Sequence, residues 1–357
     1  MLSAYFQSYV DRYSAYKGGA WCYEDGCLYR GLELLYKATG EEAWLHGLKT
    51  MLDAQILDGP TLKSYSASDY NIDNIQPGRS LLFMHKHTGT QKYLDAAHIL
   101  AAQLENHPRT VSGVYWHKQR YPWQNWLDGL YMAHPFQVEY GQITGNPAMV
   151  EDSLRQISTA LEVMIDLKTG LYAHAYDEAR AQKWADPATG RSAAHWARAL
   201  GWLAMSLVDV ASLVGPAQFQ PLETRSKQLF EQILRLRLES GLWLQVIDQP
   251  DLRGNYAETS ASAMFAYALQ RASSLGLVAL PMDVVTPLVS QCIQPKATGG
   301  FEMVDICEVA GLGEFEGRYR DGSAAYYTTE ARVSDDVKGV APLMMAVAVH
   351  QGALTPA

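Results

Sequence analysis

The sequence has few cysteines, and their spacing limits what they can do. Four occur in 357 residues, and no two of them form a Cys-x-x-Cys pair. So few scattered thiols cannot build a disulfide framework. The N-terminus also lacks a basic region followed by an apolar core, and Asp11 arrives early, so no signal peptide is expected. These absences predict a reduced, cytoplasmic protein. The cysteines are Cys22, Cys27, Cys292 and Cys307.

Basic clusters and long apolar runs are also missing. The formal net charge is -9, and no block of lysines and arginines offers a surface for phosphates, so no nucleic-acid partner is expected. The longest charge-free stretch, 339–357, is interrupted by polar residues and is too short in its apolar part to cross a membrane. No Gly-x-Gly-x-x-Gly, Walker-type or His-Glu-x-x-His motif occurs, so neither a nucleotide cofactor nor a metal is expected.

Aromatic residues are plentiful, and their distribution is uneven. The chain has 21 Tyr and 9 Trp but only 8 Phe. Tyr and Trp combine a flat apolar face with a hydrogen-bonding edge. This surplus suits a cleft that stacks on sugar rings, and ordinary core packing is the alternative explanation.

Apolar residues recur at three- and four-residue steps along almost the whole chain, as in Leu45-Leu48-Met51-Leu52. This spacing predicts helices. Glycines suited to the left-handed end of a helix follow such stretches and precede the next ones. They divide the chain into about six antiparallel helix pairs. The recurring glycines are Gly40, Gly89, Gly145, Gly215, Gly276 and Gly352.

A second repeat lies between the helix pairs. Segment 112–117 resembles segment 169–174, and 240–245 and 299–304 follow the same pattern. We expect these segments to be short extended returns at one end of the assembly. Because no Pro/Ser-rich linker separates the helix pairs, they predict a closed double ring. The expected fold is all-α, an (α/α)6 barrel of six helical hairpins that forms one domain over 1–357.

Polar residues occupy the same level of each pair, about four turns before the hairpin glycine. Each inner helix should begin there, so we expect this level to be the mouth of the barrel. It holds Tyr23, Asp73, Asp128 and Arg198. Helix capping is an alternative that suits Asp73. It suits Asp128 poorly, because apolar residues surround it, and it does not explain Arg198, since a cation opposes the dipole at a helix start.

Two histidines occupy matching positions in the repeated returns. His117 ends one return and His174 ends the next, where their side chains could face the cleft. A metal site is the alternative, but no ligand set with metal-binding spacing accompanies them. These two residues are therefore candidates for contact with a substrate.

Several segments together carry a resemblance to a known family. Segment 121–133 reads Tyr-Pro-Trp-Gln-Asn-Trp-Leu-Asp-Gly-Leu-Tyr-Met-Ala, with Asp128 near its centre. Further motifs follow in order at 170–178, 184–187, 195–202, 304–313 and 320–323. Together they resemble the unsaturated rhamnogalacturonyl hydrolases, glycoside hydrolase family 105. The resemblance covers nearly the whole chain, and it implies the same (α/α)6 barrel.

The resemblance also implies roles for individual residues. Asp128 would be the general acid and base, and Asp73 its carboxylate partner. The substrate would be an oligosaccharide that ends in a 4,5-unsaturated uronic acid, and no cofactor would be needed. The residues that would line the sugar pocket are His117, His174, Trp196, Arg198 and Trp202. Two further candidates are Tyr23, which lies at the level of the barrel mouth, and Trp126, which lies two residues before Asp128.

Such a reaction needs Asp128 to carry a proton at neutral pH. Burial among Trp123, Trp126 and Tyr131, together with the charge of Asp73, is expected to raise its pKa. For the substrate carboxylate, the sequence offers Arg198, or His117 and His174, as binding groups.

Three alternatives stay open from the sequence. One is an unsaturated glucuronyl hydrolase that acts on other lyase products. Another is a sugar epimerase or isomerase on the same barrel, which would need paired histidines at the reacting carbon. The third is a carbohydrate-binding protein with a decayed site, in which the motif aspartate would be missing. Asp128 is present.

Overall fold

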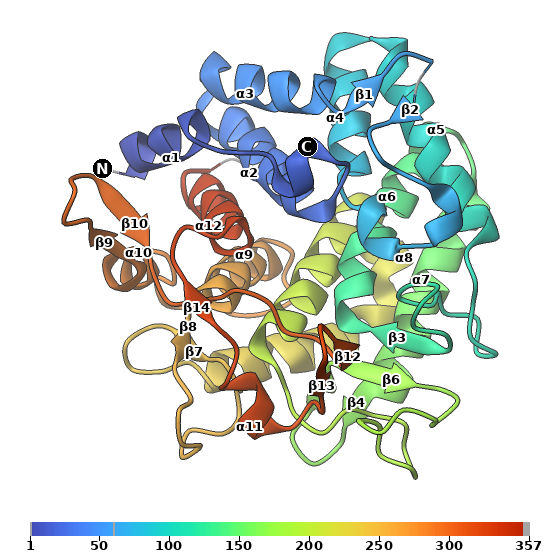
Figure 1. Ribbon diagram of the computed structural model, residues 1–357, viewed down its shortest axis with the longest axis vertical. Coiled ribbons are helices and arrows are strands. Elements are labelled where there is room, and N and C mark those ends of the chain that lie inside the picture. Colours follow the sequence, from blue (N-terminus) through green and yellow to red (C-terminus); the bar gives the residue numbers. More distant parts are fainter. Residues whose placement is uncertain (1, 60, 353–357) are drawn as a thin grey trace.

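The computed structural model describes residues 2–59 and 61–352, which are mainly helical (Figure 1). Six helical segments in these residues pack side by side in a ring, and α12 contacts both α2 and α9, which closes it. The predicted (α/α)6 barrel is confirmed. The inner segments are α2 (Tyr23–Thr39), α4 (Gly78–Thr88), α6 (Leu127–Ile143), the first part of α8 (Ala197–Arg235), α9 (Thr259–Ser274) and α12 (Val337–His350).

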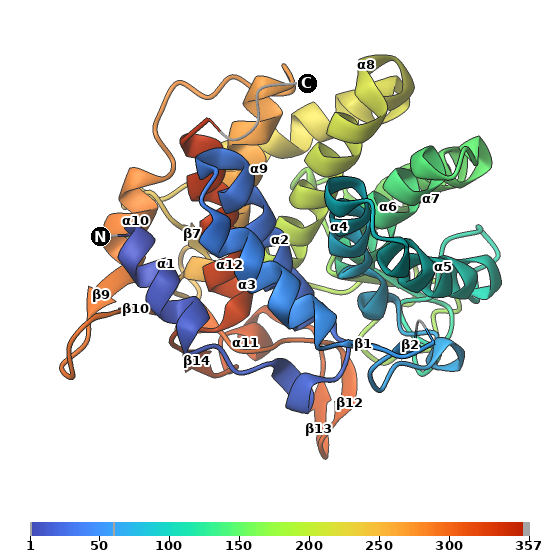
Figure 2. The same cartoon turned by 90° about the horizontal axis from the view of Figure 1, so that it is seen from above.

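Outer helices cover the inner ring (Figure 2). Helices α3, α5, α7 and α10 each pack against the inner helix that precedes them. The sixth pair is completed from the other end of the chain by α1, whose Leu2 lines one groove with Val347 and His350 of α12. Tyr5 of α1 donates a hydrogen bond to Asp335, 2.7 Å away. The outer helices are α1 (Leu2–Asp11), α3 (Glu42–Asp53), α5 (Gln91–Asn106), α7 (Pro147–Met164), the second part of α8 and α10 (Thr286–Cys292).

The recurring glycines end the inner segments as expected. Gly40 and Gly89 have left-handed backbones, with φ 69° and ψ 9° or 8°. Gly215 differs, with φ 74° and ψ 171°, and it divides α8 into its inner and outer parts. By length and composition α8 could span a membrane, but 72% of its most apolar window is buried inside the barrel. The apolar run in α8 is thus part of the protein core.

Substitution of Gly215 tests the backbone geometry of this hairpin. Its φ and ψ lie in a region that only glycine adopts readily, so Gly215→Asn should lower the free energy of unfolding by about 1–3 kcal/mol. Gly40→Asn is the matched control, because asparagine tolerates the left-handed conformation found there. Urea unfolding of both variants measures the difference. Equal losses would show that Gly215 imposes no special constraint.

Short strands connect the helix pairs at the mouth, as the repeated returns predict. Three of the four returns contain a strand, whereas 112–117 contains only an isolated bridge between Arg109 and Tyr115. Every sheet in the described residues consists of two antiparallel strands. They are β1 (Ile56–Leu57) with β2 (Thr61–Leu62), β3 (Gln124–Trp126) with β6 (Ala175–Asp177), β4 (Ile165–Asp166) with β5 (Leu171–Tyr172), β7 (Trp243–Leu244) with β8 (Ala257–Glu258), β9 (Ile293–Pro295) with β10 (Phe301–Met303), β11 (Ile306–Cys307) with β14 (Arg332–Val333), and β12 (Gly313–Phe315) with β13 (Arg318–Arg320).

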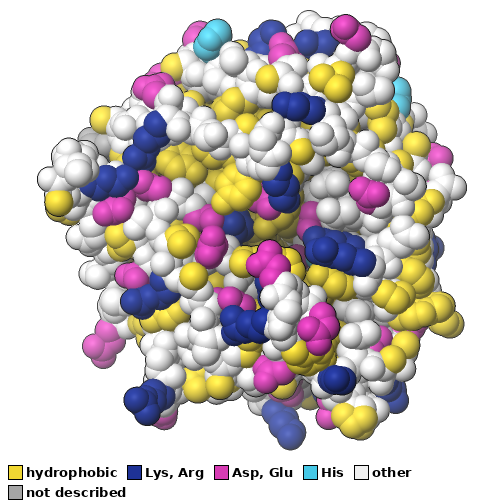
Figure 3. Space-filling view, in the orientation of Figure 1, with side chains coloured by type: hydrophobic (Ala, Val, Ile, Leu, Met, Phe, Trp, Pro, Cys, Tyr) yellow, Lys and Arg dark blue, Asp and Glu magenta, His cyan; other side chains and the backbone are white. Residues whose placement is uncertain are grey.

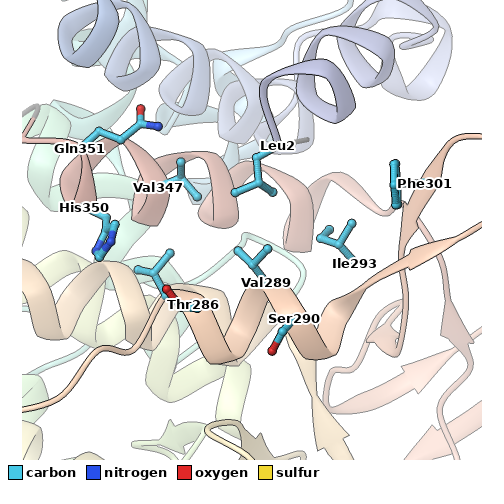
Figure 4. A pocket seen from close by; sticks show the side chains of 10 residues that line it. Leu2, Thr286, Val289, Ser290, Ile293, Phe301, Val347, His350 and Gln351 are labelled. Atoms are coloured by element: carbon cyan, nitrogen blue, oxygen red, sulfur yellow. The ribbon is translucent and has the colours of Figure 1, made fainter.

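Burial separates the two rings, and it follows the sequence pattern. The apolar runs 203–207 and 264–269 lie in inner helices and are buried throughout, whereas outer helices such as α7 bury only one face. A groove of about 500 Å³ remains at the seam between α1, α10 and α12 (Figure 4). Its walls are mostly apolar, and His350 is the one titratable side chain among them. It therefore lacks the carboxylates that acid–base chemistry on a sugar requires.

Candidate active site

A polar cavity of about 290 Å³ opens at the end of the barrel where the inner helices begin. Figure 3 shows a hollow near the middle of this face, with side chains of both charges around it. Five of the sequence candidates line the cavity. Within residues 2–59 and 61–352, no group of three or more His, Cys, Asp and Glu side chains is arranged to hold a metal ion. The five lining candidates are Tyr23, Asp73, His117, Trp126 and Asp128.

Asp128 lies in the first turn of α6, directly after β3. Its side chain is only 16% exposed, and its Oδ2 is 3.2 Å from Nε2 of His174. Neither atom has a hydrogen-bond partner among the described residues, so the two groups face each other without the alignment of a hydrogen bond. The other ring nitrogen of His174 lies 2.7 Å from the hydroxyl of Tyr327, in α11 (Ala324–Tyr327). His174 is thus held rigidly behind the carboxylate.

The charge state of Asp128 corrects the sequence-based expectation. Burial raises the pKa of its carboxyl, and so does the charge of Asp73. The imidazoles of His174 and His117 outweigh both, so the pKa of Asp128 lies below its ordinary value. The prediction of a raised pKa is therefore wrong for the protein without substrate. The expected apolar neighbours are present, but the nearby histidine favours the ionised form.

Asp73 lies in a short 3-10 turn, η3 (Ile72–Ile75), just before α4. Its Oδ2 is 2.5 Å from Nζ of Lys118, and its Oδ1 is 3.6 Å from Nε2 of His117. Burial raises the pKa of Asp73, but Lys118 and His117 more than compensate, and the pKa is lowered. The carboxylate of Asp73 caps no helix, so the capping explanation is wrong for this residue.

Three parallel rings form one wall of the cavity. The ring of His117 stacks on Trp126 with centroids 4.7 Å apart, and the ring of Tyr121 stacks on Trp126 with centroids 5.0 Å apart. Burial lowers the pKa of His117 to about 4, so this imidazole is neutral at pH 7. A wall of flat aromatic faces with a neutral imidazole suits contact with a sugar ring.

Four sequence candidates do not line the cavity but lie behind it. Besides His174, Trp202 is buried, stacked on Tyr131 and in edge contact with Tyr23. Trp196 stacks on Tyr327 and packs against His174. These two tryptophans thus support residues nearer the cavity instead of facing it.

Arg198 is the fourth candidate behind the cavity, and it is only 1% exposed. Its guanidinium donates hydrogen bonds to the carbonyl oxygens of Cys307 and Glu308 and to the hydroxyl of Ser260. Because the guanidinium is already used by these carbonyls, Arg198 does not reach the cavity. It ties the start of α8 to β11, which explains a cation at this helix terminus.

Other cavity residues were not predicted from the repeat. Lys118 follows His117 directly, and Tyr121 begins the central motif, so their position in the chain could have indicated them. Phe315 and Arg320 come from the β12–β13 hairpin, which has no equivalent in the other repeats. Arg320 does belong to the late motif at 320–323, but that resemblance assigns it no role.

Comparison with known proteins identifies the family. Residues 5–351 match Glycosyl Hydrolase Family 88. The 24.9 kDa protein of the picA locus of Rhizobium radiobacter is 49% identical over 227 residues, which are 61% of this chain and 97% of that protein. The unsaturated rhamnogalacturonyl hydrolase YesR of Bacillus subtilis is 33% identical over 265 residues, 72% of each chain.

A solved structure agrees with these relatives. The family 105 glycoside hydrolase of C. acetobutylicum superposes with a TM-score of 0.91 and 32% identity, over 99% of this chain and 98% of that one. The family match, the relatives and the fold thus all indicate a glycoside hydrolase. The chain belongs to Glycosyl Hydrolase Family 88, and the resemblance of its motifs to the family 105 unsaturated rhamnogalacturonyl hydrolases is confirmed.

Proposed function

We propose that this glycoside hydrolase removes a 4,5-unsaturated uronic acid from the non-reducing end of oligosaccharides made by polysaccharide lyases. The observation that carries the proposal is the convergence of Asp128 and Asp73 on one cavity, beside the stacked rings of His117 and Trp126. The relative from Bacillus subtilis is named as an enzyme on such a substrate and supports the same activity here.

The chemistry follows from the unsaturated bond. In this sugar the C4=C5 double bond is a vinyl ether conjugated to a carboxylate, so the reaction does not begin at the anomeric carbon. Asp128 protonates C4, and positive charge develops at C5 and the ring oxygen. Water then adds at C5, and the ionised Asp128 accepts its proton. The resulting hemiketal opens, and the remaining hemiacetal at C1 releases the linked sugar. One water is consumed overall.

The lowered pKa of Asp128 requires that substrate changes its environment. A bound sugar displaces water from the cavity, and loss of hydration favours the neutral carboxylic acid. The charge of Asp73 acts in the same direction. Asp128 can therefore take up a proton as the complex forms and donate it to C4. Asp73 keeps its negative charge, because Lys118 remains paired with it.

Within this activity, we propose an unsaturated galacturonyl residue linked to rhamnose as the substrate. The named activity of the Bacillus subtilis relative supports this choice over unsaturated glucuronyl substrates. The cavity volume of about 290 Å³ is at the low end for small-molecule sites and favours one terminal residue over the middle of a polymer. An epimerase would need two histidines at the sugar, and of the candidate pair only His117 lines the cavity.

A set of unsaturated disaccharides tests the proposal. The linked sugar is varied, and loss of the ultraviolet absorbance of the conjugated C4=C5 bond is followed over time. We expect the rhamnose-linked galacturonyl compound to be cleaved fastest. Cleavage of saturated disaccharides at a similar rate would contradict the proposed chemistry. Preference for another linked sugar would change only the finer assignment.

Replacement of Asp73 tests its electrostatic role. Asp73→Asn removes the negative charge that raises the pKa of Asp128. The pKa of Asp128 should then be lower, so its protonated form is lost at a lower pH. The pH optimum of activity should therefore become more acidic. The pH profile of kcat measures the shift. Glu24→Gln is the control, because Glu24 also lines the cavity but is not among the main groups that shift the pKa of Asp128. An unmoved profile for Asp73→Asn would contradict the role.

A further inference from the structure

Arg320 combines burial with a place at the cavity. It ends β13, pairs with Gly313 of β12, and its side chain is 9% exposed. The hairpin projects beside the mouth of the barrel (Figure 2) and lies near β3, where Leu312 packs in one cluster with Trp126. This packing brings a cation from late in the chain to the cavity that Asp128 lines.

The positive charge of Arg320 has no carboxylate partner at hydrogen-bonding distance among the described residues. Its closest carboxylate oxygen among the described residues is Oε1 of Glu330, 4.0 Å from Nε, which is an ion pair without a hydrogen bond. Its central carbon lies 3.8 Å above the ring of Phe315. No hydrogen bond to its terminal nitrogens occurs in residues 2–59 and 61–352. A buried arginine normally uses several of its five N–H groups.

The other cations of the cavity wall differ from Arg320. Lys17 is 2.9 Å from Glu24, and Lys118 is 2.5 Å from Asp73, so both are paired with carboxylates. Arg120 lies over the ring of Tyr121 and is exposed to solvent. Arg320 is therefore the buried cation of this cavity whose terminal N–H groups remain available.

The backbone beside Arg320 leaves room for this side chain. A Cβ atom on Gly311 would lie 2.6 Å from its Nη1, which is too close for any real contact. The absence of a side chain at Gly311 thus lets the guanidinium lie against the backbone, at the cavity wall. The backbone at Gly311 thus leaves space for the guanidinium of Arg320, a residue of the cavity wall.

We propose that Arg320 binds the carboxylate of the terminal uronic acid with its terminal N–H groups. The inference rests on the proposed function and adds the group that recognises the substrate charge. Planar guanidinium groups match carboxylates in a two-pronged arrangement. A neutral sugar would leave the buried cation unpaired, so the same residue selects against substrates without the acid group. This assignment replaces Arg198, whose guanidinium is occupied by backbone carbonyls.

The test compares an unsaturated uronyl disaccharide with its methyl ester. The ester keeps the double bond and the linked sugar but lacks the negative charge. Wild-type protein should show a KM for the acid about 30-fold or more below that for the ester. Arg320→Gln should raise the KM for the acid by a similar factor and leave the ester nearly unchanged. Arg320→Lys should recover part of the preference, because the charge returns without the two-pronged geometry.

Arg318→Gln is the matched control for this test. Arg318 lies in the same strand, is 3.5 Å from Glu330, and has a side chain 47% exposed. It does not belong to the cavity wall. Its replacement should leave the preference for the acid intact, and thermal unfolding of each variant checks that the hairpin folds.

The outcomes separate this inference from the proposed function. If Arg320→Gln folds and still prefers the acid as strongly as wild type, Arg320 is not the binding group, although the enzyme is active. If wild type cleaves neither acid nor ester, the proposed function itself fails. An equal loss on acid and ester would also overturn the inference, since it would show a general effect on the site.

Discussion

Asp128→Asn should lower turnover of the unsaturated substrate by about 10²–10⁴-fold, the contribution that general acid–base catalysis typically makes. Asparagine keeps the shape of the side chain, but it can neither donate a carboxylic proton to C4 nor accept one from water. The substrate should still bind, because the stacked wall of His117 and Trp126 and the surrounding cavity stay in place. Steady-state kinetics and binding titration on the same variant measure both quantities.

An exposed aspartate provides the control for this variant. Asp251 is exposed and does not line the cavity, so Asp251→Asn should keep the wild-type rate. If Asp128→Asn retains more than about a tenth of wild-type turnover, the acid–base role is wrong. Loss of binding together with turnover would instead show that the carboxylate mainly holds the substrate.

The second large effect concerns stability. Asp209, in the inner part of α8, forms a buried ion pair with Arg79 of α4 and accepts a hydrogen bond from the hydroxyl of Tyr267 at 2.5 Å. Asp209→Ala leaves Arg79 buried, and its remaining carboxylate partner among the described residues is Glu139, at 3.5 Å. Breaking one side of a buried ion pair costs about 3–5 kcal/mol, so the urea midpoint should fall strongly.

Two comparisons show whether the buried pair causes this loss. Replacement of both partners, Arg79→Leu with Asp209→Leu, should recover much of the stability, because no uncompensated charge remains. Glu223→Ala breaks a half-exposed pair with Lys227 and should cost about 1 kcal/mol or less. A similar small loss for Asp209→Ala would contradict the account of the barrel interior.

The fold could be predicted from the sequence because its signals are local. Helical periodicity and helix-ending glycines such as Gly40 and Gly89 report on the residues next to them, and their repetition indicates a ring. The same repetition indicated Asp73 and Asp128, and both line one cavity at the end of the barrel where the inner helices begin. Closure by α1 carries no such signal, because it joins the two ends of the chain.

The parts of the site that could not be predicted depend on contacts between distant segments. Burial raises the pKa of Asp128, but His174, whose ring is placed by Tyr327 from late in the chain, does most to lower it below its ordinary value. Arg198 does oppose the helix dipole, as its position indicated, but carbonyls of 307 and 308 compensate for it. Arg320 lies in a hairpin outside the repeat, so no register could place it beside the other cavity residues.

Reaction in heavy water tests the central claim most directly. If Asp128 protonates C4, solvent deuterium carried by this carboxyl should be delivered to one face of the double bond. NMR of the first-formed product should then show deuterium at C4 in a single configuration. Attack at the anomeric carbon would release the unsaturated sugar first, and its later rearrangement in solution would place deuterium on both faces. Cleavage with C4 labelled in both configurations, or not at all, would contradict hydration of the double bond by the enzyme.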